Sequence, residues 1–123
     1  LTRKYADTDK PHVRMTERAV DPARLDFIDA ATSSHNHTDH LDAETLRPLL
    51  DANRDLVLVI PEANSAFVAD RLSIPAEMPM ALPIGDRAEI GPFEITAVPA
   101  AHEALDPQFV GYVVRCGEWT LYH

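Results

Sequence analysis

The hexapeptide His35–His40 constrains this chain more than any other feature, because it places three imidazoles and one carboxylate within six residues. Side chains alternate sides along extended backbone, so His35 and His37 face the same way and can share one metal ion. Asp39 and His40 begin the next turn and reach a second position. The pattern therefore predicts the start of two adjacent metal sites, whereas the alternative explanation is a solvated loop that happens to be rich in histidine.

A third nitrogen for the first position is available at His102, which directly follows a predicted strand. Three protein ligands and one open position for water are typical of catalytic zinc sites. Imidazole and carboxylate groups suit zinc, manganese and iron, so we expect two divalent metal ions, with zinc or manganese favoured and iron as a third candidate. These ligands predict a metal-dependent hydrolase.

Three further residues are weaker candidates. Glu103 follows His102 in the sequence and is either a hydrogen-bond partner of a ligand imidazole or a solvated acid. His12 and Arg14 lie in a polar lead-in and can meet an anionic group of a substrate, although isolated polar residues near a terminus are more often exposed and idle.

The composition narrows the partners. The 123 residues carry 20 acidic and 11 basic side chains, a formal net charge of −9, which argues against a nucleic-acid partner. We expect a small-molecule substrate, anionic groups included, and an oligomer is compatible with the sequence. The only cysteine is Cys116 and the longest aliphatic run is Leu56–Ile60, so we expect no disulfide, no membrane span and a cytoplasmic location.

The first part of the chain is predicted to alternate strand and helix, which indicates an α/β fold. Residues 1–24 read as an extended lead-in with a short helical turn. The elements expected after it are a buried strand over 26–34, a helix from Asp42 to Asn53, a buried strand over 56–60, and a helix that begins at Pro61. Ala63, Phe67 and Leu72 are expected on the inner face of that last helix. The hexapeptide then lies at the carboxyl end of a strand, where α/β proteins place their chemistry.

The second part of the chain is predicted to be antiparallel. Prolines 75, 79 and 83 indicate a loop, and residues 87–90 and 93–98 flank Gly91-Pro92 as a hairpin. Residues 110–115 and 119–123 bracket a second turn at 116–118.

Residues 32–42 resemble the signature loop of the metallo-β-lactamase superfamily. The segments Pro99–Glu103, Gly111-Tyr112 and Leu121–His123 are most similar to its L-ascorbate-6-phosphate lactonase (UlaG-like) branch. The resemblance implies a metallo-β-lactamase-type αββα sandwich, of which residues 1–123 form a partial metallo-hydrolase domain, about the first half, truncated at both ends.

The resemblance also implies roles for the candidate residues. His35, His37 and His102 would hold one metal, and Asp39 and His40 would contribute to the second and take part in catalysis. The family's bridging aspartate and last histidine would follow His123, and the loop between Glu103 and Gly111 looks shorter than usual. The isolated segment is therefore expected to be inactive.

In the full-length protein, a metal-bound hydroxide is expected to attack the carbonyl of a lactone or a similar ester. Two alternatives stay open at this point. One is a phosphodiesterase of the same superfamily, because the same pair of metals serves in-line displacement. The other is a non-catalytic relative that binds metal without turnover.

Overall fold

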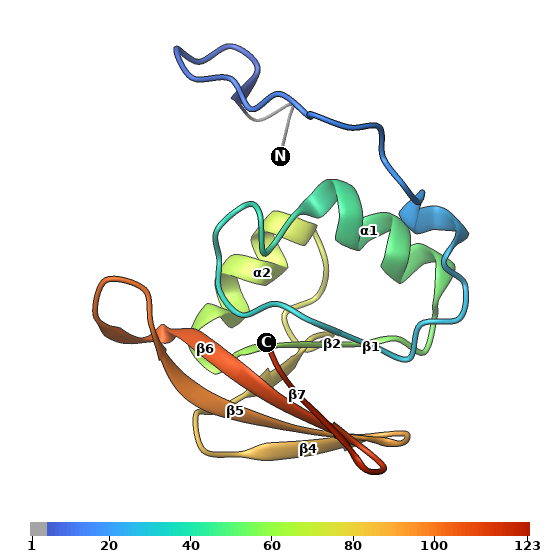
Figure 1. Ribbon diagram of the computed structural model, residues 1–123, viewed down its shortest axis with the longest axis vertical. Helices are drawn as coiled ribbons and strands as arrows, with labels where there is room; N and C mark the ends of the chain where they lie inside the picture. The colour runs from blue at the N-terminus through green and yellow to red at the C-terminus, as the bar shows by residue number, and fades with distance from the viewer. Residues whose placement is uncertain (1–4) are drawn as a thin grey trace.

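Two sheets of opposite character follow one another along the chain in the computed structural model, which describes residues 5–123 (Figure 1). The first four residues of the predicted lead-in lie outside the described range. The first sheet is parallel, and its neighbouring strands are β1 (Ala30–Thr32), β2 (Val57–Pro61) and β3 (Met80–Leu82). The second sheet is antiparallel, and its neighbouring strands are β4 (Arg87–Ile90), β5 (Phe93–Ala101), β6 (Leu105–Cys116) and β7 (Trp119–Tyr122).

Helices α1 (Ala43–Ala52) and α2 (Ser65–Leu72) lie on one side of the parallel sheet, and the antiparallel sheet lies on the other (Figure 1). β2 supplies both cores because its side chains alternate: Leu58 and Ile60 face the helices, and Val59 faces the second sheet. The α/β fold and three layers of the predicted αββα sandwich are thus present. Among residues 5–123, no helix covers the far face of the antiparallel sheet, and no helix is long and apolar enough to cross a bilayer.

The predicted helix from Asp42 to Asn53 is confirmed, with these two residues as its caps. Asn53 also fixes the chain that enters the first strand. Its side-chain amide donates to the carbonyl oxygens of Leu25 and Leu49, and its side-chain oxygen accepts from the backbone N–H of Ile28. The predicted lead-in is confirmed over its described residues as an exposed segment that ends in a short 3-10 turn, Pro22–Arg24.

The strand predicted over 26–34 is shorter than expected. It covers only Ala30–Thr32, and Phe27, which was expected to be buried, is 71% exposed. The reason is that the N–H of Ile28 bonds to the Asn53 side chain and not to a neighbouring strand. Sheet pairing therefore begins only after Asp29, whose carbonyl accepts from the N–H of Val57.

The prediction that a helix begins at Pro61 is wrong. Pro61 ends β2, where it pairs with Leu82, and a 3-10 turn separates it from α2, which begins at Ser65. The inner face of α2 also differs from the predicted one. Val68 and Leu72 are buried, as predicted for Leu72, whereas the residues expected beside it on that face, Ala63 and Phe67, are exposed.

The segment with prolines 75, 79 and 83, predicted to be a loop, contains the short strand β3. Met80–Leu82 fits between two prolines and pairs in parallel with β2. The two predicted hairpins are confirmed, and positive φ angles at Gly91 and Gly117 allow their tight turns. β6 begins at Leu105, earlier than expected, so most of the segment between Glu103 and Gly111 is strand.

Candidate metal centre

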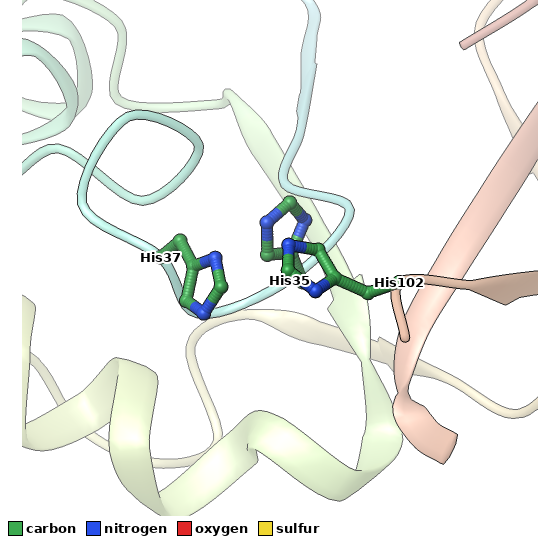
Figure 2. A group of neighbouring side chains, drawn as sticks. All are labelled: His35, His37 and His102. Carbon is green, nitrogen blue, oxygen red and sulfur yellow. The ribbon is translucent and has the colours of Figure 1, made fainter. Parts of the chain in front are cut away.

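Three imidazoles from two distant parts of the chain converge at one end of the two sheets. His35 and His37 lie on the loop after β1, and His102 lies at the turn between β5 and β6 (Figure 2). One ring nitrogen from each lies within 4.8 Å of the others. His35 is buried, and His37 and His102 are exposed. The structure thus brings together the three residues predicted for the first metal position.

The donor set fits a first-row divalent cation. Tetrahedral coordination with metal–nitrogen bonds of about 2.0–2.1 Å separates ligand nitrogens by about 3.4 Å. The observed spread is somewhat larger, and rotation of the two exposed side chains can close it because neither is held by packing on all sides. Neutral imidazoles are also the ligand type that zinc, manganese and iron accept.

The side chain of Ser33 joins the two ends of the histidine loop, residues 35–40. Its hydroxyl oxygen lies 3.0 Å from the carbonyl oxygens of both His35 and His40. Between them the chain makes a helical turn, in which the carbonyl of His37 accepts from the N–H groups of His40 and Leu41 at 3.1 and 2.7 Å. This turn explains why His40 folds back toward His35, with ring centroids 4.0 Å apart.

Arg71 holds the same loop from α2. Its Nη1 donates to the carbonyl oxygen of Asn36 and, at 3.4 Å, to that of Leu41. The guanidinium also lies over the ring of Phe67, 4.4 Å from its centroid. One side chain therefore connects both ends of the turn that carries His37 to the helix beneath it.

Burial keeps His35 neutral. Its pKa is lowered from 6.5 to about 4, chiefly because burial penalises the charged imidazolium. Smaller contributions in the same direction come from the neighbouring imidazoles of His40, His37 and His102, and the carboxylate of Asp39 acts in the opposite direction. A neutral ring has a nitrogen lone pair to donate, so His35 is available as a ligand at neutral pH.

Asp39 and His40, the residues predicted for the second position, lie side by side at the edge of the first. Oδ2 of Asp39 is 3.6 Å from Nε2 of His40, a separation that suits two ligands of one cation. Among the described residues they form a pair only, since the single set of three or more ligand groups is the histidine triad. This chain therefore offers two donors to a second metal.

Phe109 on β6 supports the triad from the opposite side and was missed in the sequence. Its ring stacks on His102 with centroids 4.9 Å apart and planes 25° apart, and it lies 5.1 Å from the ring of His35. The only sequence signal is an aromatic residue that follows the His102 turn, and this signal is too weak to identify it.

The weaker candidates line cavities around the loop. His12 and Arg71 line a groove of about 450 Å³ that also contacts His37, and Arg14 lines one of about 260 Å³ beside Asp39 and His40. Glu103 lines a third cavity, of about 320 Å³, together with His37, His102 and Phe109.

Glu103 was expected to be either a hydrogen-bond partner of a ligand imidazole or a solvated acid. It is exposed, and within residues 5–123 it makes no hydrogen bond to an imidazole.

Three residues that sequence reasoning did not assign, Ser33, Ser34 and Arg71, hold the loop. The serines precede the hexapeptide directly, so their position was a usable signal. Arg71 lies 30 residues after Leu41 in a separate helix, and nothing in the sequence pattern connects it to the loop.

The chain is similar to a known protein family and to named proteins. A family described as "Beta-lactamase superfamily domain" matches residues 7–123. Two curated relatives, from Escherichia fergusonii and Escherichia coli, carry the name "Probable L-ascorbate-6-phosphate lactonase UlaG". Both are 25% identical to this chain over 93% of its length. The chain spans 37% of the length of these relatives.

Solved structures show the same fold. A proposed metal-dependent hydrolase from Parabacteroides distasonis matches with a TM-score of 0.61 and 20% identity, over 83% of this chain and 46% of the other. CmlA, a diiron β-hydroxylase from Streptomyces venezuelae, matches with a TM-score of 0.63 and 23% identity, over 77% of this chain and 20% of the other.

Proposed function

The chain belongs to the metallo-β-lactamase superfamily, and on this premise we propose that it carries the three-histidine part of a hydrolytic metal centre for a lactone or a similar ester. The observation that carries the proposal is the convergence of His35, His37 and His102 from two separate segments, with ring nitrogens within 4.8 Å. A surface loop rich in histidine would not require a partner about 65 residues away in the sequence.

In this proposal the candidate ligands fall into two groups. The imidazoles of His35, His37 and His102 hold a divalent cation, and Asp39 and His40 donate to a second one. Zinc, manganese or iron bound there supplies Lewis acidity and activates water for attack on a carbonyl. Oδ2 of Asp39 and Nε2 of His40 lie 3.6 Å apart, and both residues line a cavity that is open to a small molecule.

The cavities favour a small substrate with an anionic group at one end. The groove of about 450 Å³ beside His37 is of the size that holds small molecules. Arg71 and His12 bring basic groups to it, and Asp39 is the one acidic residue in the described part of the chain that lines it. The cavity beside His102 contains Glu103, Asp106 and the ring of Phe109, so it suits an uncharged part of the substrate better than an anion. The net charge of −9 disfavours a long polyanion.

The names of the relatives support the choice of a lactone. The curated proteins are named as lactonases, whereas the structural neighbours include both a proposed hydrolase and a β-hydroxylase. The fold alone therefore does not select the reaction. Because the chain spans 37% of the lactonase relatives, the substrate and activity of the whole protein belong to this proposal.

Metal analysis and an activity assay on matched variants test it. Zinc, manganese and iron are titrated separately into the chain, and lactones, phosphodiesters and acyl esters are offered to the full-length protein. His37→Ala is expected to abolish tight metal binding and hydrolysis. His123→Ala removes an imidazole that contacts Thr32, outside the triad, and should keep both. Hydrolysis that survives in His37→Ala would contradict the proposal.

A further inference from the structure

Ser34 connects the two metal positions through a single oxygen atom. Its Oγ lies 3.0 Å from Nδ1 of His35 and 3.2 Å from Nδ1 of His40. The side chain is buried, with 8% of the residue exposed. Ser34 thus contacts one imidazole of the histidine triad and the imidazole that pairs with Asp39, and it contacts each ring on the same nitrogen.

The hydrogen-bonding capacity of the Ser34 hydroxyl and of the two imidazoles limits which tautomers the rings can adopt. A hydroxyl has one proton to donate and two lone pairs that accept, and a neutral imidazole carries its proton on one nitrogen only. If Ser34 donates to one ring, that ring carries its proton on Nε2, and Nε2 cannot then bind a metal. If Ser34 accepts from both rings, both carry their proton on Nδ1, and both Nε2 lone pairs are free.

The second arrangement is the one compatible with metal binding by both rings. Nε2 of His40 already lies 3.6 Å from Oδ2 of Asp39, on the side where a cation would be shared. His35 contributes a nitrogen to the triad while its Nδ1 is engaged by Ser34, which leaves Nε2 as the donor. Metal-binding histidines usually donate their other ring N–H to an acceptor that fixes the tautomer in this way.

We propose that Ser34 is a shared positioning residue, whose oxygen accepts from Nδ1 of both His35 and His40 and so presents both Nε2 atoms to the two metal positions. Free neutral histidine prefers the proton on Nε2, the nitrogen needed for the metal. The Ser34 oxygen reverses that preference in two rings at once. The inference rests on the proposed metal centre, but its first consequence concerns the metal-free chain.

The tautomers can be read directly in the absence of metal. Long-range proton–nitrogen NMR correlations distinguish Nδ1–H from Nε2–H, and at about pH 8 ordinary imidazoles are neutral. We expect Nδ1–H in both His35 and His40 of the unaltered chain. At His40 the Asp39 carboxylate favours a proton on Nε2, but it lies 3.6 Å away, whereas the Ser34 oxygen lies 3.2 Å from Nδ1. In Ser34→Ala both rings should move toward Nε2–H, and Ser34→Thr, which keeps the hydroxyl, should retain Nδ1–H.

Ser33 supplies the matched control. Its hydroxyl bonds to the carbonyl oxygens of His35 and His40 and not to their rings, so Ser33→Ala loosens the loop backbone and should leave both rings protonated on Nδ1. An equal tautomer change in Ser33→Ala and Ser34→Ala would overturn the proposal, because loop order and not the Ser34 oxygen would then set the tautomer. Ser34→Cys, a near-isosteric change to a weak acceptor, covers the case in which Ser34→Ala fails to fold.

Zinc titration gives the second readout. Removing a hydrogen-bond partner of a metal-binding imidazole lowers metal affinity by about 10–100-fold, and we expect this loss in Ser34→Ala. The zinc affinity of Ser34→Thr should be close to that of the unaltered chain. Unchanged tautomers and unchanged zinc affinity in Ser34→Ala would refute the role of Ser34. Failure of the unaltered chain to bind zinc would instead refute the proposed metal centre, and the NMR result on the metal-free rings would still decide the role of Ser34.

Discussion

The two segments that meet at the metal centre are built differently. The loop after β1 is tied down by side chains other than its own ligands: Ser33 and Ser34 bond within it, and Arg71 bonds to it from α2. The turn between β5 and β6 carries His102 at an exposed hairpin tip, where the stacking partner is Phe109. One side of the site is held in place before a metal arrives, and the other can adjust to it.

Because of this difference, the imidazoles of His35 and His102 would contribute to metal binding in different ways. His35 is buried and hydrogen-bonded, so its position is fixed by folding, whereas His102 is exposed and is held chiefly by its stack on Phe109. A loop of fixed geometry selects where a metal binds, and an adjustable ligand lets the coordination distances shorten to those of a particular metal.

The largest effect is expected from removing one ligand on each side. His35→Ala and His102→Ala should both weaken zinc binding by more than about 100-fold, since loss of a ligand exceeds the loss of an outer partner. Without metal the two variants should differ. His35→Ala should destabilise the chain by about 1–3 kcal/mol, because it removes a buried, hydrogen-bonded ring. His102→Ala should cost less, about 0.5–1.5 kcal/mol, because it removes an exposed ring whose main contact is the stack on Phe109. Denaturant unfolding in a chelator measures this, and equal losses would contradict the contrast.

Arg71→Ala should release the loop from α2. Hydrogen bonds from a charged donor to the carbonyl oxygens of Asn36 and Leu41 contribute about 1.5–3 kcal/mol in similar settings, and we expect a loss near the lower end because the side chain is only partly buried. Arg87→Ala is the control, because Arg87 pairs with Glu94 at the surface and should contribute less than about 1 kcal/mol. Urea unfolding of both variants makes the comparison.

The metal-free chain should lose stability as the pH falls from about 6.5 to about 4. The pKa of His35 is lowered to about 4 in the folded chain and is near 6.5 when unfolded, so the unfolded chain binds the proton first. His35→Gln removes this titration and should flatten the pH dependence in that interval. A His102→Gln chain, which keeps His35, should retain the slope. Thermal unfolding across the pH range provides the data.

The smallest effect is expected at the hairpin side. Phe109→Leu keeps an apolar side chain but removes the ring that stacks on His102, an interaction worth about 0.5–1.5 kcal/mol. We expect zinc affinity to fall by a few-fold. Trp119→Leu changes an exposed aromatic residue on β7 and should leave the affinity unchanged. Equal affinities in the Phe109→Leu and unaltered chains would show that the stack does not position His102.

The sequence was sufficient to predict that His35, His37 and His102 come together, and to predict the regular elements that repeat a clear pattern. Alternation placed His35 beside His37, and the caps at Asp42 and Asn53 marked α1 correctly. These features depend on local spacing, which a sequence records directly. The helix after β2 was placed too early because Pro61 can begin a helix or end a strand, and only its pairing with Leu82 decides between them.

The residues that hold the candidate ligands in place could not be predicted from the sequence, for a different reason. Arg71 bonds to the backbone of the histidine loop, and Phe109 stacks on the ring of His102. Both contacts join separate elements, and neither residue carries a local pattern of its own. β3 was too short for any periodicity to appear, and its strand conformation comes from its pairing with β2. Candidate metal ligands are therefore easier to recognise in this chain than the residues that hold those ligands in place.

A crystal of the chain soaked with zinc and measured at the zinc absorption edge tests the central claim most directly. We predict an anomalous peak bonded to ring nitrogens of His35, His37 and His102, at about 2.0–2.1 Å from each. No peak at the triad, or a peak that leaves out His102, would contradict the account.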